Sequence, residues 1–325
     1  MRMPEYLSNS SINLFYSDRT DFYLRYLAQI RPPRFPQTKP MSVGSAFDAY
    51  VKAFLVKKLL GDRPAFYRDK LFEQQVEKHN WDWAREAGQY AFEAYERSGA
   101  LRDLLIELEQ ASGEPRFEFT VRRTIGGVPL LGKPDLWFVT HDGLHVIFDW
   151  KVNGFCSKRG QSPKAGYMMI SDGWDEKDYP RSRNHRQAHK NCHPMNIGGI
   201  VVNVGKYLED VDASWGQQTC IYGWLMGEEV GGRFITGIDQ LACAPGAPDK
   251  PRIRVARHRG RASKGYQETL WKKVSFVWET IHSGHIFDEL TYEESKKKQL
   301  LLDGYHKLYD SDDPMDRWFA AATRT

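Results

Sequence analysis

Residues 116–152 read RFEFTVRRTIGGVPLLGKPDLWFVTHDGLHVIFDWKV and carry the clearest structural pattern in the chain. Apolar and polar side chains alternate from Phe117 to Val121, which predicts a half-buried strand. The rest of the stretch predicts a turn, a second strand, a tight hairpin turn and a third strand, at Gly126-Gly127, Val128–Val139, Asp142-Gly143 and Leu144–Val152. We therefore expect an antiparallel meander of three strands.

Helical patterns lie on both sides of this meander. Before it, they cover Ser10–Leu27, a stretch from Ser42 with one apolar face, and Asp69–Leu108; after it, they cover Trp215–Met226 and Tyr266–His282. Arg233–Cys243 and Arg252–His258 predict a further pair of strands. The fold class expected is α/β in the mixed α+β sense: a central mixed sheet containing an antiparallel meander and flanked by helices.

We expect a single domain spanning residues 1–325. Its parts are an N-terminal helical part at about 8–112, a core at about 113–152 and 215–285, a polar insertion at about 153–214 and a peripheral tail at 286–325.

The composition predicts a folded chain that remains in a reducing cytoplasm. Apolar residues make up 41% and aromatic residues 13% of 325 residues, enough for a sizeable core. The four cysteines form no C-x-x-C pair. We find no signal-peptide pattern and no apolar run long enough to cross a membrane, so we expect no membrane partner.

The candidate site lies on the predicted hairpin. Asp135 follows Pro134 on the second strand, and Asp149 and Lys151 end the third. Adjacent antiparallel strands bring the two aspartates to the same end of the sheet, and Asp149 and Lys151 share one face. Two carboxylates suit a hard cation such as Mg²⁺, beside which a lysine can orient a water. The alternative is a surface strand that ends in an ordinary Asp–Lys pair.

A local basic strip follows in a chain whose net charge is only +4. Its members alternate along a predicted strand and the following loop: Arg252, Arg254, Arg257, Arg259, Arg261 and Lys264. Guanidinium groups presented in this way bind the DNA backbone without reading sequence. The alternative is a solvated edge strand protected by its charge.

Pro134-Asp135 and Asp149-x-Lys151 together resemble the PD-(D/E)xK nuclease superfamily, most closely its RecB-like exonuclease branch, including phage-type members. Gly44-Ser45-Ala46-Phe47-Asp48 is similar to the helix motif that opens the branch, and Gln218 and Tyr222 match its Q-x-x-x-Y motif. The resemblance covers about residues 8–280, is poor over 153–214, and implies a restriction-endonuclease-like core.

The resemblance also implies roles for individual residues. Asp135 and Asp149 become metal ligands with the backbone carbonyl of Trp150, and Lys151 positions the attacking water. Gln218 and Tyr222, which share a helical face, line the active site; alternatively they are a capping Gln and a core Tyr.

Two further acids are expected ligands of Mg²⁺ or Mn²⁺, with one or two ions bound. Glu118 matches an acid of the family, although exposed acids are routine on such strands. Asp48 stands where many relatives have a histidine, and its alternative is a surface acid paired with Lys52.

Other cofactors are not expected. The cysteines that hold an iron–sulfur cluster in some relatives are missing, so we predict no cluster. Residues 127–133 resemble the start of a phosphate-binding loop, but Pro134 replaces the required Ser/Thr and a strand follows, so no nucleotide is expected. His185, His189, Cys192 and His193 have a spacing that could bind zinc, but the run is rich in Arg and Lys and lacks a companion Cys pair, so a polar insertion near DNA is favoured over a zinc site.

The function implied is a metal-dependent DNA exonuclease that hydrolyses phosphodiester bonds in recombination, repair or phage DNA processing. It would act in the cytoplasm of a bacterial cell or phage-infected host, with a separate helicase or a single-strand annealing or binding protein as a partner. The alternatives are a structure-selective endonuclease of the same fold, a catalytically silent DNA-binding subunit, and a zinc-stabilised nucleic-acid binder.

Overall fold

The computed structural model describes residues 2–29, 36–164, 168–170, 193–197, 200–204, 207–246 and 250–283. Residues 116–153 form the expected hairpin strands, but divided between two sheets. The strands are β1 (Arg116–Phe117), β2 (Val121–Ile125), β3 (Val128–Gly132), β4 (Leu136–Val139) and β5 (His145–Asn153). β1, β4 and β5 belong to the main sheet, whereas β2 and β3 pair only with each other.

Both of the first two expected strands are interrupted, one at Glu118 and the other at Lys133–Asp135. Glu118 adopts a positive φ of 46°, which turns the chain out of the main sheet. Pro134 has no N–H to donate to a ladder, so β3 ends just before it. The Glu118 amide donates to the Asp135 carbonyl at 3.1 Å, so the two bends lie side by side.

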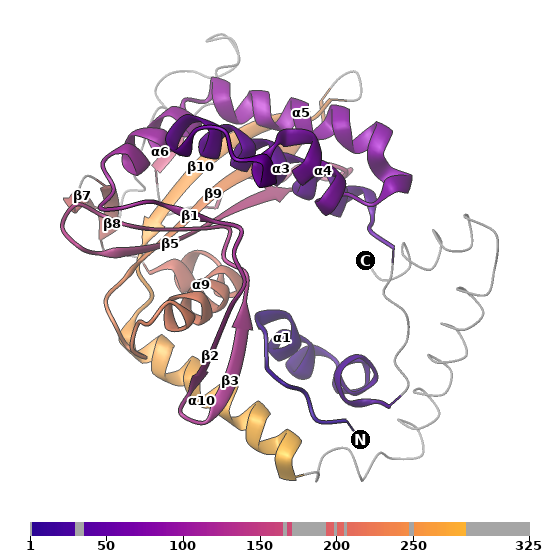
Figure 1. Ribbon diagram of the computed structural model, residues 1–325, viewed down its shortest axis with the longest axis vertical. Helices are drawn as coiled ribbons and strands as arrows, with labels where there is room; N and C mark the ends of the chain where they lie inside the picture. The colour runs from indigo at the N-terminus through magenta and orange to yellow at the C-terminus, as the bar shows by residue number, and fades with distance from the viewer. Residues whose placement is uncertain are drawn as a thin grey trace.

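The β2–β3 hairpin projects away from the main sheet toward α10 (Lys264–Ser283) (Figure 1). Its turn needs Gly126 and Gly127, whose φ angles of 50° and 82° are costly for residues with a Cβ. A Cβ on Gly126 would also approach the Trp271 ring of α10 to 3.1 Å.

The main sheet is mixed, as expected, with the strand order β1-β4-β5-β9-β10-β6. Its remaining strands are β9 (Ile235–Ala244), β10 (Arg252–Gly260) and β6 (Met168–Ile170). β5 and β9 run parallel, with Asp149 opposite Ile238, while the other neighbours are antiparallel. The fold is therefore a mixed α/β sheet flanked by helices.

Two groups of helices cover the faces of this sheet (Figure 1). One face packs against α3 (Lys39–Leu60), α5 (Trp81–Arg97) and α6 (Ala100–Glu109), in a core that includes Phe148 and Trp150. α4 (Arg68–Gln75) packs on α3. The other core joins α1 (Asn9–Ser17), α2 (Arg19–Phe22), a π-helical turn (Tyr23–Leu27), α9 (Ala213–Leu225) and α10.

The helical stretch expected over 69–108 is divided. Val76 is extended and ends α4, and Gly99, with a φ of 82°, separates α5 from α6. Short 3₁₀ turns at Pro64–Phe66 and Lys78–Asn80 flank α4. Periodicity alone overlooked these breaks because the apolar side chains of Val76 and Trp81 continue the pattern at the ends of the first break, and only Ser98 and Gly99 form the second.

The region expected as a polar insertion contributes strands where it is described. β6 pairs with β10, β7 (His193–Ile197) pairs with β8 (Ile200–Val204), and α8 (Leu208–Val211) precedes α9. His185, His189, Cys192 and the tail at 286–325 lie outside the described residues. The division of the chain into these parts stays a prediction. Within the described residues, no helix combines the length and apolar character needed to cross a membrane.

Candidate active site

The β4–β5 hairpin brings Asp135 and Asp149 together. Leu136 is paired with Phe148, so the aspartate before Leu136 and the one after Phe148 lie at the same end of the two strands. The two carboxyl groups are hydrogen-bonded to each other. The placement expected from the sequence is therefore observed, and Phe148 and Trp150 point into the core as alternation requires.

Lys151 links this pair to α9. Its Nζ donates to Asp149 Oδ2 at 2.6 Å and to Gln218 Oε1 at 2.9 Å. Gln218 Nε2 in turn donates to the hydroxyl of Tyr222 at 3.2 Å. The Asp212 side chain caps α9 by accepting from Ser214 and Trp215, which fixes the start of the helix that carries both residues. Gln218 and Tyr222 thus join the hairpin residues.

A second acidic group is built around Lys52 of α3. The ammonium donates to Asp48 Oδ2 at 2.6 Å and to Asp135 Oδ1 at 2.8 Å, and it also contacts Glu118 Oε2. One carboxylate oxygen from each of Asp48, Glu118 and Asp135 lies within 4.8 Å of the others. Lys133 contacts the other oxygen of Glu118. Asp135 belongs to both groups.

Sequence reasoning missed the central position of Lys52, which it considered only as a surface partner of Asp48. The signal was present, because residues 46–56 read AFDAYVKAFLV and carry one acid and one base in an otherwise apolar run. A helical segment that is apolar nearly all round is buried, so the single lysine within residues 46–56 is expected to be buried with it. Lys52 is 0% exposed.

The charges of the site are strongly coupled. Burial, together with the carboxylates of Asp135 and Glu118, raises the pKa of Asp48 to about 7 against the opposing effect of Lys52. Burial also raises the pKa of Asp149 well above its usual value, despite Lys151. The pKa of Asp135 is lowered: burial opposes ionisation, but Lys52, the hydrogen bond with Asp149 and Lys151 outweigh it. Asp135 therefore ionises more readily than Asp149.

These side chains line one cavity of about 740 Å³, open between the end of the hairpin, α3, α4 and α9. Trp150, whose backbone carbonyl is an expected ligand, also lines it. The polar residues that line it include Asp48, Glu118, Lys133, Asp135, Asp149, Lys151, Gln218 and Tyr222, and others from residues 37–45 and 73–78.

The residues of this cavity fit a divalent cation. Four buried or half-buried carboxyl groups, those of Asp48, Glu118, Asp135 and Asp149, lie among the ammonium groups of Lys52, Lys133 and Lys151, so the carboxyl groups outnumber the cations by one. Asp48 Oδ1 is buried without a hydrogen-bond partner, an arrangement that is unfavourable unless a cation or another donor is bound there. Carboxylate and carbonyl oxygens are the ligands that Mg²⁺ and Mn²⁺ prefer.

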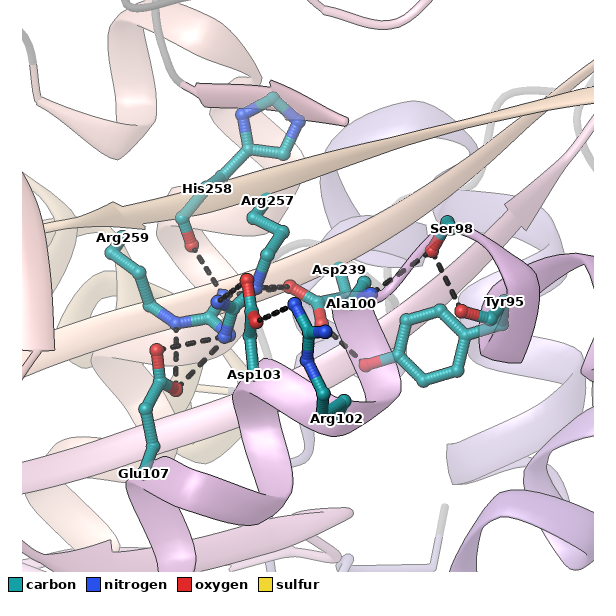
Figure 2. A network of polar contacts seen from close by, with 10 residues as sticks. All are labelled: Tyr95, Ser98, Ala100, Arg102, Asp103, Glu107, Asp239, Arg257, His258 and Arg259. Atoms are coloured by element: carbon teal, nitrogen blue, oxygen red, sulfur yellow. Dashed lines mark hydrogen bonds and ion pairs between the residues drawn. The ribbon is translucent and has the colours of Figure 1, made fainter. Parts of the chain in front are cut away.

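Two members of the basic strip are not at the surface. Arg257 and Arg259 on β10 are 8% and 3% exposed and bind the acids Glu107 and Asp239 in a buried network (Figure 2). Their guanidinium groups are held by these acids, so the expectation that they bind DNA is wrong. The alternation of the arginines did not predict that these two point inward, because their acidic partner Glu107 lies 150 residues away from Arg257 in the sequence.

The other members of the strip are at least partly accessible. Arg252 and Lys264 are exposed, while Arg254 and Arg261 are half-buried. Arg254 donates to Ser162 at 3.1 Å, and Lys264 pairs with Glu268 at 3.7 Å. A DNA-binding role for these four stays a prediction.

Two of the solved structures to which the chain is similar are weak likenesses. A protein described as "Putative exonuclease" from Eubacterium rectale has a TM-score of 0.39 and 14% identity, over 87% of this chain and 83% of its own. A protein designated SSO0001 has a TM-score of 0.21 and 15% identity, over 74% of this chain and 98% of its own. At these values neither likeness supports a statement about activity. The comparison with curated proteins gave no match.

The family comparison is specific. A sequence profile described as the PD-(D/E)XK nuclease superfamily matches residues 6–165, which include the whole hairpin and α3 with Lys52. The match ends before Gln218 and Tyr222. Members of this superfamily are nucleases, hydrolases that act on nucleic acid with divalent metal ions. Through residues 6–165, the chain belongs to the PD-(D/E)XK nuclease superfamily.

Proposed function

We propose that the protein is a metal-dependent DNA exonuclease of the RecB-like type. The observation that carries this proposal is the convergence of Asp135, Asp149 and Lys151 with Gln218 and Tyr222 on the wall of one cavity. Three of these residues come from the hairpin and two from a helix more than sixty residues later. Their meeting in space supports an active site better than the isolated Asp-x-Lys motif does.

In this proposal Asp135 and Asp149, with the Trp150 carbonyl, hold Mg²⁺ or Mn²⁺. When bound, the ion supplies Lewis acidity toward the phosphate and lowers the pKa of a bound water. A metal ligand must be deprotonated, so a bound ion would lower the pKa of Asp149, which burial raises in the metal-free protein.

Lys151 and the α9 residues act on the nucleophile and the phosphate. The Lys151 ammonium is fixed by Asp149 and Gln218, so it can orient a water for attack and offset negative charge as the new bond forms. The Tyr222 hydroxyl accepts from Gln218 Nε2, which leaves its own proton free for a phosphate oxygen. Burial raises the pKa of Tyr222, so this proton is retained at neutral pH.

Attack from DNA ends is supported by resemblance alone. The sequences Gly44-Ser45-Ala46-Phe47-Asp48 and Gln218-Thr219-Cys220-Ile221-Tyr222 are similar to motifs of the RecB-like branch. The structure adds that Asp48, Gln218 and Tyr222 line the same cavity as the hairpin residues. A role in recombination, repair or phage DNA processing and a helicase or annealing partner stay predictions.

The test compares end-labelled linear duplex, linear single strand and covalently closed circular DNA, each with Mg²⁺, with Mn²⁺ and with EDTA. We expect loss of the linear substrates only, dependent on metal. Asp149→Asn should lower the rate by about three orders of magnitude, because it removes one of the metal-binding charges. The matched control is Asp142→Asn, at the exposed turn of the same hairpin, which should leave the rate unchanged.

Other results would redirect the proposal. Metal-dependent cutting of the circle would identify an endonuclease of the same fold. Binding to DNA without cleavage, unaffected by Asp149→Asn, would identify a catalytically silent DNA-binding subunit.

A further inference from the structure

The Lys52 ammonium occupies the centre of the acidic group formed by Asp48, Glu118 and Asp135. It contacts one oxygen of each carboxylate, at 2.6 Å for Asp48 and 2.8 Å for Asp135, with Glu118 also in contact. An ammonium has three N–H donors, and all three are used here. The group is therefore already organised around a positive charge that belongs to the chain itself.

The Lys52 ammonium is held in this position by the packing around its side chain. It lies in the buried part of α3, one residue from Val51 and Ala53, and its side chain is 0% exposed. An ammonium buried without partners is strongly unfavourable, so leaving the carboxylates would be costly. We therefore regard Lys52 as a fixed part of the site.

The hydrogen bonds divide the site into two halves that share Asp135. Asp135 Oδ1 is taken by Lys52, and the Asp135 carboxyl is also bonded to Asp149. The half around Lys52 has its own cation. The half formed by Asp135 and Asp149 has Lys151 at its edge, where the ammonium donates to Asp149 and, on its other side, to Gln218.

We propose that Lys52 takes the place of a second divalent ion, so that the protein binds one metal ion, at Asp135 and Asp149. Asp48 and Glu118 then act on this ion only indirectly, by holding Lys52 and Asp135 in position. This inference rests on the proposed function, because it assumes that the Asp135–Asp149 pair binds a metal.

The competing outcome also has a structural basis. Asp48 Oδ1 is buried and has no hydrogen-bond partner, and it is the atom through which a second ion would bind if Lys52 moved aside. A direct count of bound ions separates the two arrangements and does not depend on nuclease activity.

The experiment titrates the full-length protein with Mn²⁺ and measures free and bound ion by electron paramagnetic resonance in the absence of DNA. We expect one bound Mn²⁺ for the wild type and none for Asp149→Asn. Lys52→Met should bind two ions, because Asp48, Glu118 and Asp135 then lose the cation that they share. Lys52→Met combined with Asp149→Asn should retain one ion, at the group that Lys52 had occupied.

Two bound ions in the wild type, or a single ion in Lys52→Met, would overturn this inference while leaving the proposed function intact. A wild type that binds no Mn²⁺ and cleaves no DNA would instead overturn the proposed function, and the inference with it.

A variant that keeps Lys52 guards against a failure of Lys52→Met to fold. Asp48→Asn removes one charge of the group and leaves Lys52 with Glu118 and Asp135, so it should fold and still bind one ion. Loss of the ion in Asp48→Asn would show that Asp48 is a direct ligand, and the inference would be wrong. Asp142→Asn is the control and should bind as the wild type does.

Discussion

The acidic cavity and the buried arginine network of Figure 2 use the same kinds of side chain in two different ways. In the network, Asp103, Glu107 and Asp239 are matched by Arg102, Arg257 and Arg259. In the cavity, Asp48, Glu118, Asp135 and Asp149 outnumber Lys52, Lys133 and Lys151. The network pairs three acids with three arginines, whereas the acidic site has one more carboxyl group than ammonium groups.

The two clusters lie close together along β5. Trp150 donates its indole N–H to the Tyr95 hydroxyl at 3.3 Å, and the Tyr95 hydroxyl in turn donates a hydrogen bond to Asp239 of the network. Asp149 and Lys151, on either side of Trp150, line the cavity. Neighbouring residues of one strand thus belong to two different clusters, one with matched acids and bases and one with a carboxyl group in excess. The ratio of acids to bases and the access to a cavity distinguish the site from the buried network better than residue type does.

The largest expected effect is on the scaffold. Arg259→Met leaves Asp239, which is 0% exposed, without its 2.7 Å partner, and should lower the free energy of unfolding by about 3–5 kcal/mol. The cleavage rate per folded molecule should be unchanged. Urea unfolding of Arg259→Met beside Arg252→Met, an exposed arginine of the same strand, measures the difference. A folded Arg259→Met with impaired cleavage would break the distinction between the two clusters.

Lys151→Met should show the opposite pattern. It removes the ammonium that orients the nucleophile, so the cleavage rate should fall by about 10²–10³-fold. The loss of stability should be smaller than in Arg259→Met, because Asp149, with its raised pKa, can take up a proton in place of its partner. Single-turnover cleavage and urea unfolding of the same preparation test both statements. A stability loss as large as that of Arg259→Met would contradict this account.

A smaller effect is expected from His258, which is buried on β10 next to the network. Burial lowers its pKa to about 3, whereas an unfolded histidine titrates near 6.5. Only the unfolded chain gains this proton between these values, so stability is complete above about pH 6.5 and falls as the pH is lowered. From pH 7 to pH 5 the loss from this group should be about 2 kcal/mol.

The comparison that isolates this group uses His258→Gln, whose free energy of unfolding should fall less between pH 7 and pH 5 than that of the wild type. His141→Gln is the matched control, because the His141 side chain is 86% exposed. Equal pH dependence in wild type and His258→Gln would mean that the buried histidine is not held neutral.

The smallest effect concerns the accessible part of the basic strip. Arg252→Ala combined with Lys264→Ala should weaken DNA binding slightly and reduce the slope of log affinity against log salt by about one for each phosphate that is no longer neutralised. Lys57→Ala, exposed at the end of α3, is the control. An equal change in the control would show that bulk charge alone, rather than this strip, accounts for the effect.

The part of the site that could be predicted from the sequence is the part made by local pairing. Asp135 and Asp149 are joined by a tight hairpin, so their meeting follows from strand pairing alone. Gln218 and Tyr222 share a face because they are four residues apart on a helix. The resemblance to the nuclease family then predicted that this face lines the active site.

The remainder depended on long-range packing. Whether Arg257 points to solvent or inward is decided by Glu107 of α6, which no local pattern relates to β10. Likewise, Lys52 meets Glu118 and Asp135 only after α3 packs over the hairpin. Breaks at Glu118 and at Lys133–Asp135 were hidden because alternation continues through both bends.

The left-handed backbone of Glu118 has a consequence for how this protein could be evolved in the laboratory. Among the described residues it is the single non-glycine position with a positive φ. This conformation costs a residue with a Cβ about 1–2 kcal/mol. Glycine at position 118 would relieve this cost but would remove one of the three carboxylates that hold the buried Lys52 ammonium. Selection of a variant library for thermostability should therefore retain an acid at this strained position, as selection for cleavage should.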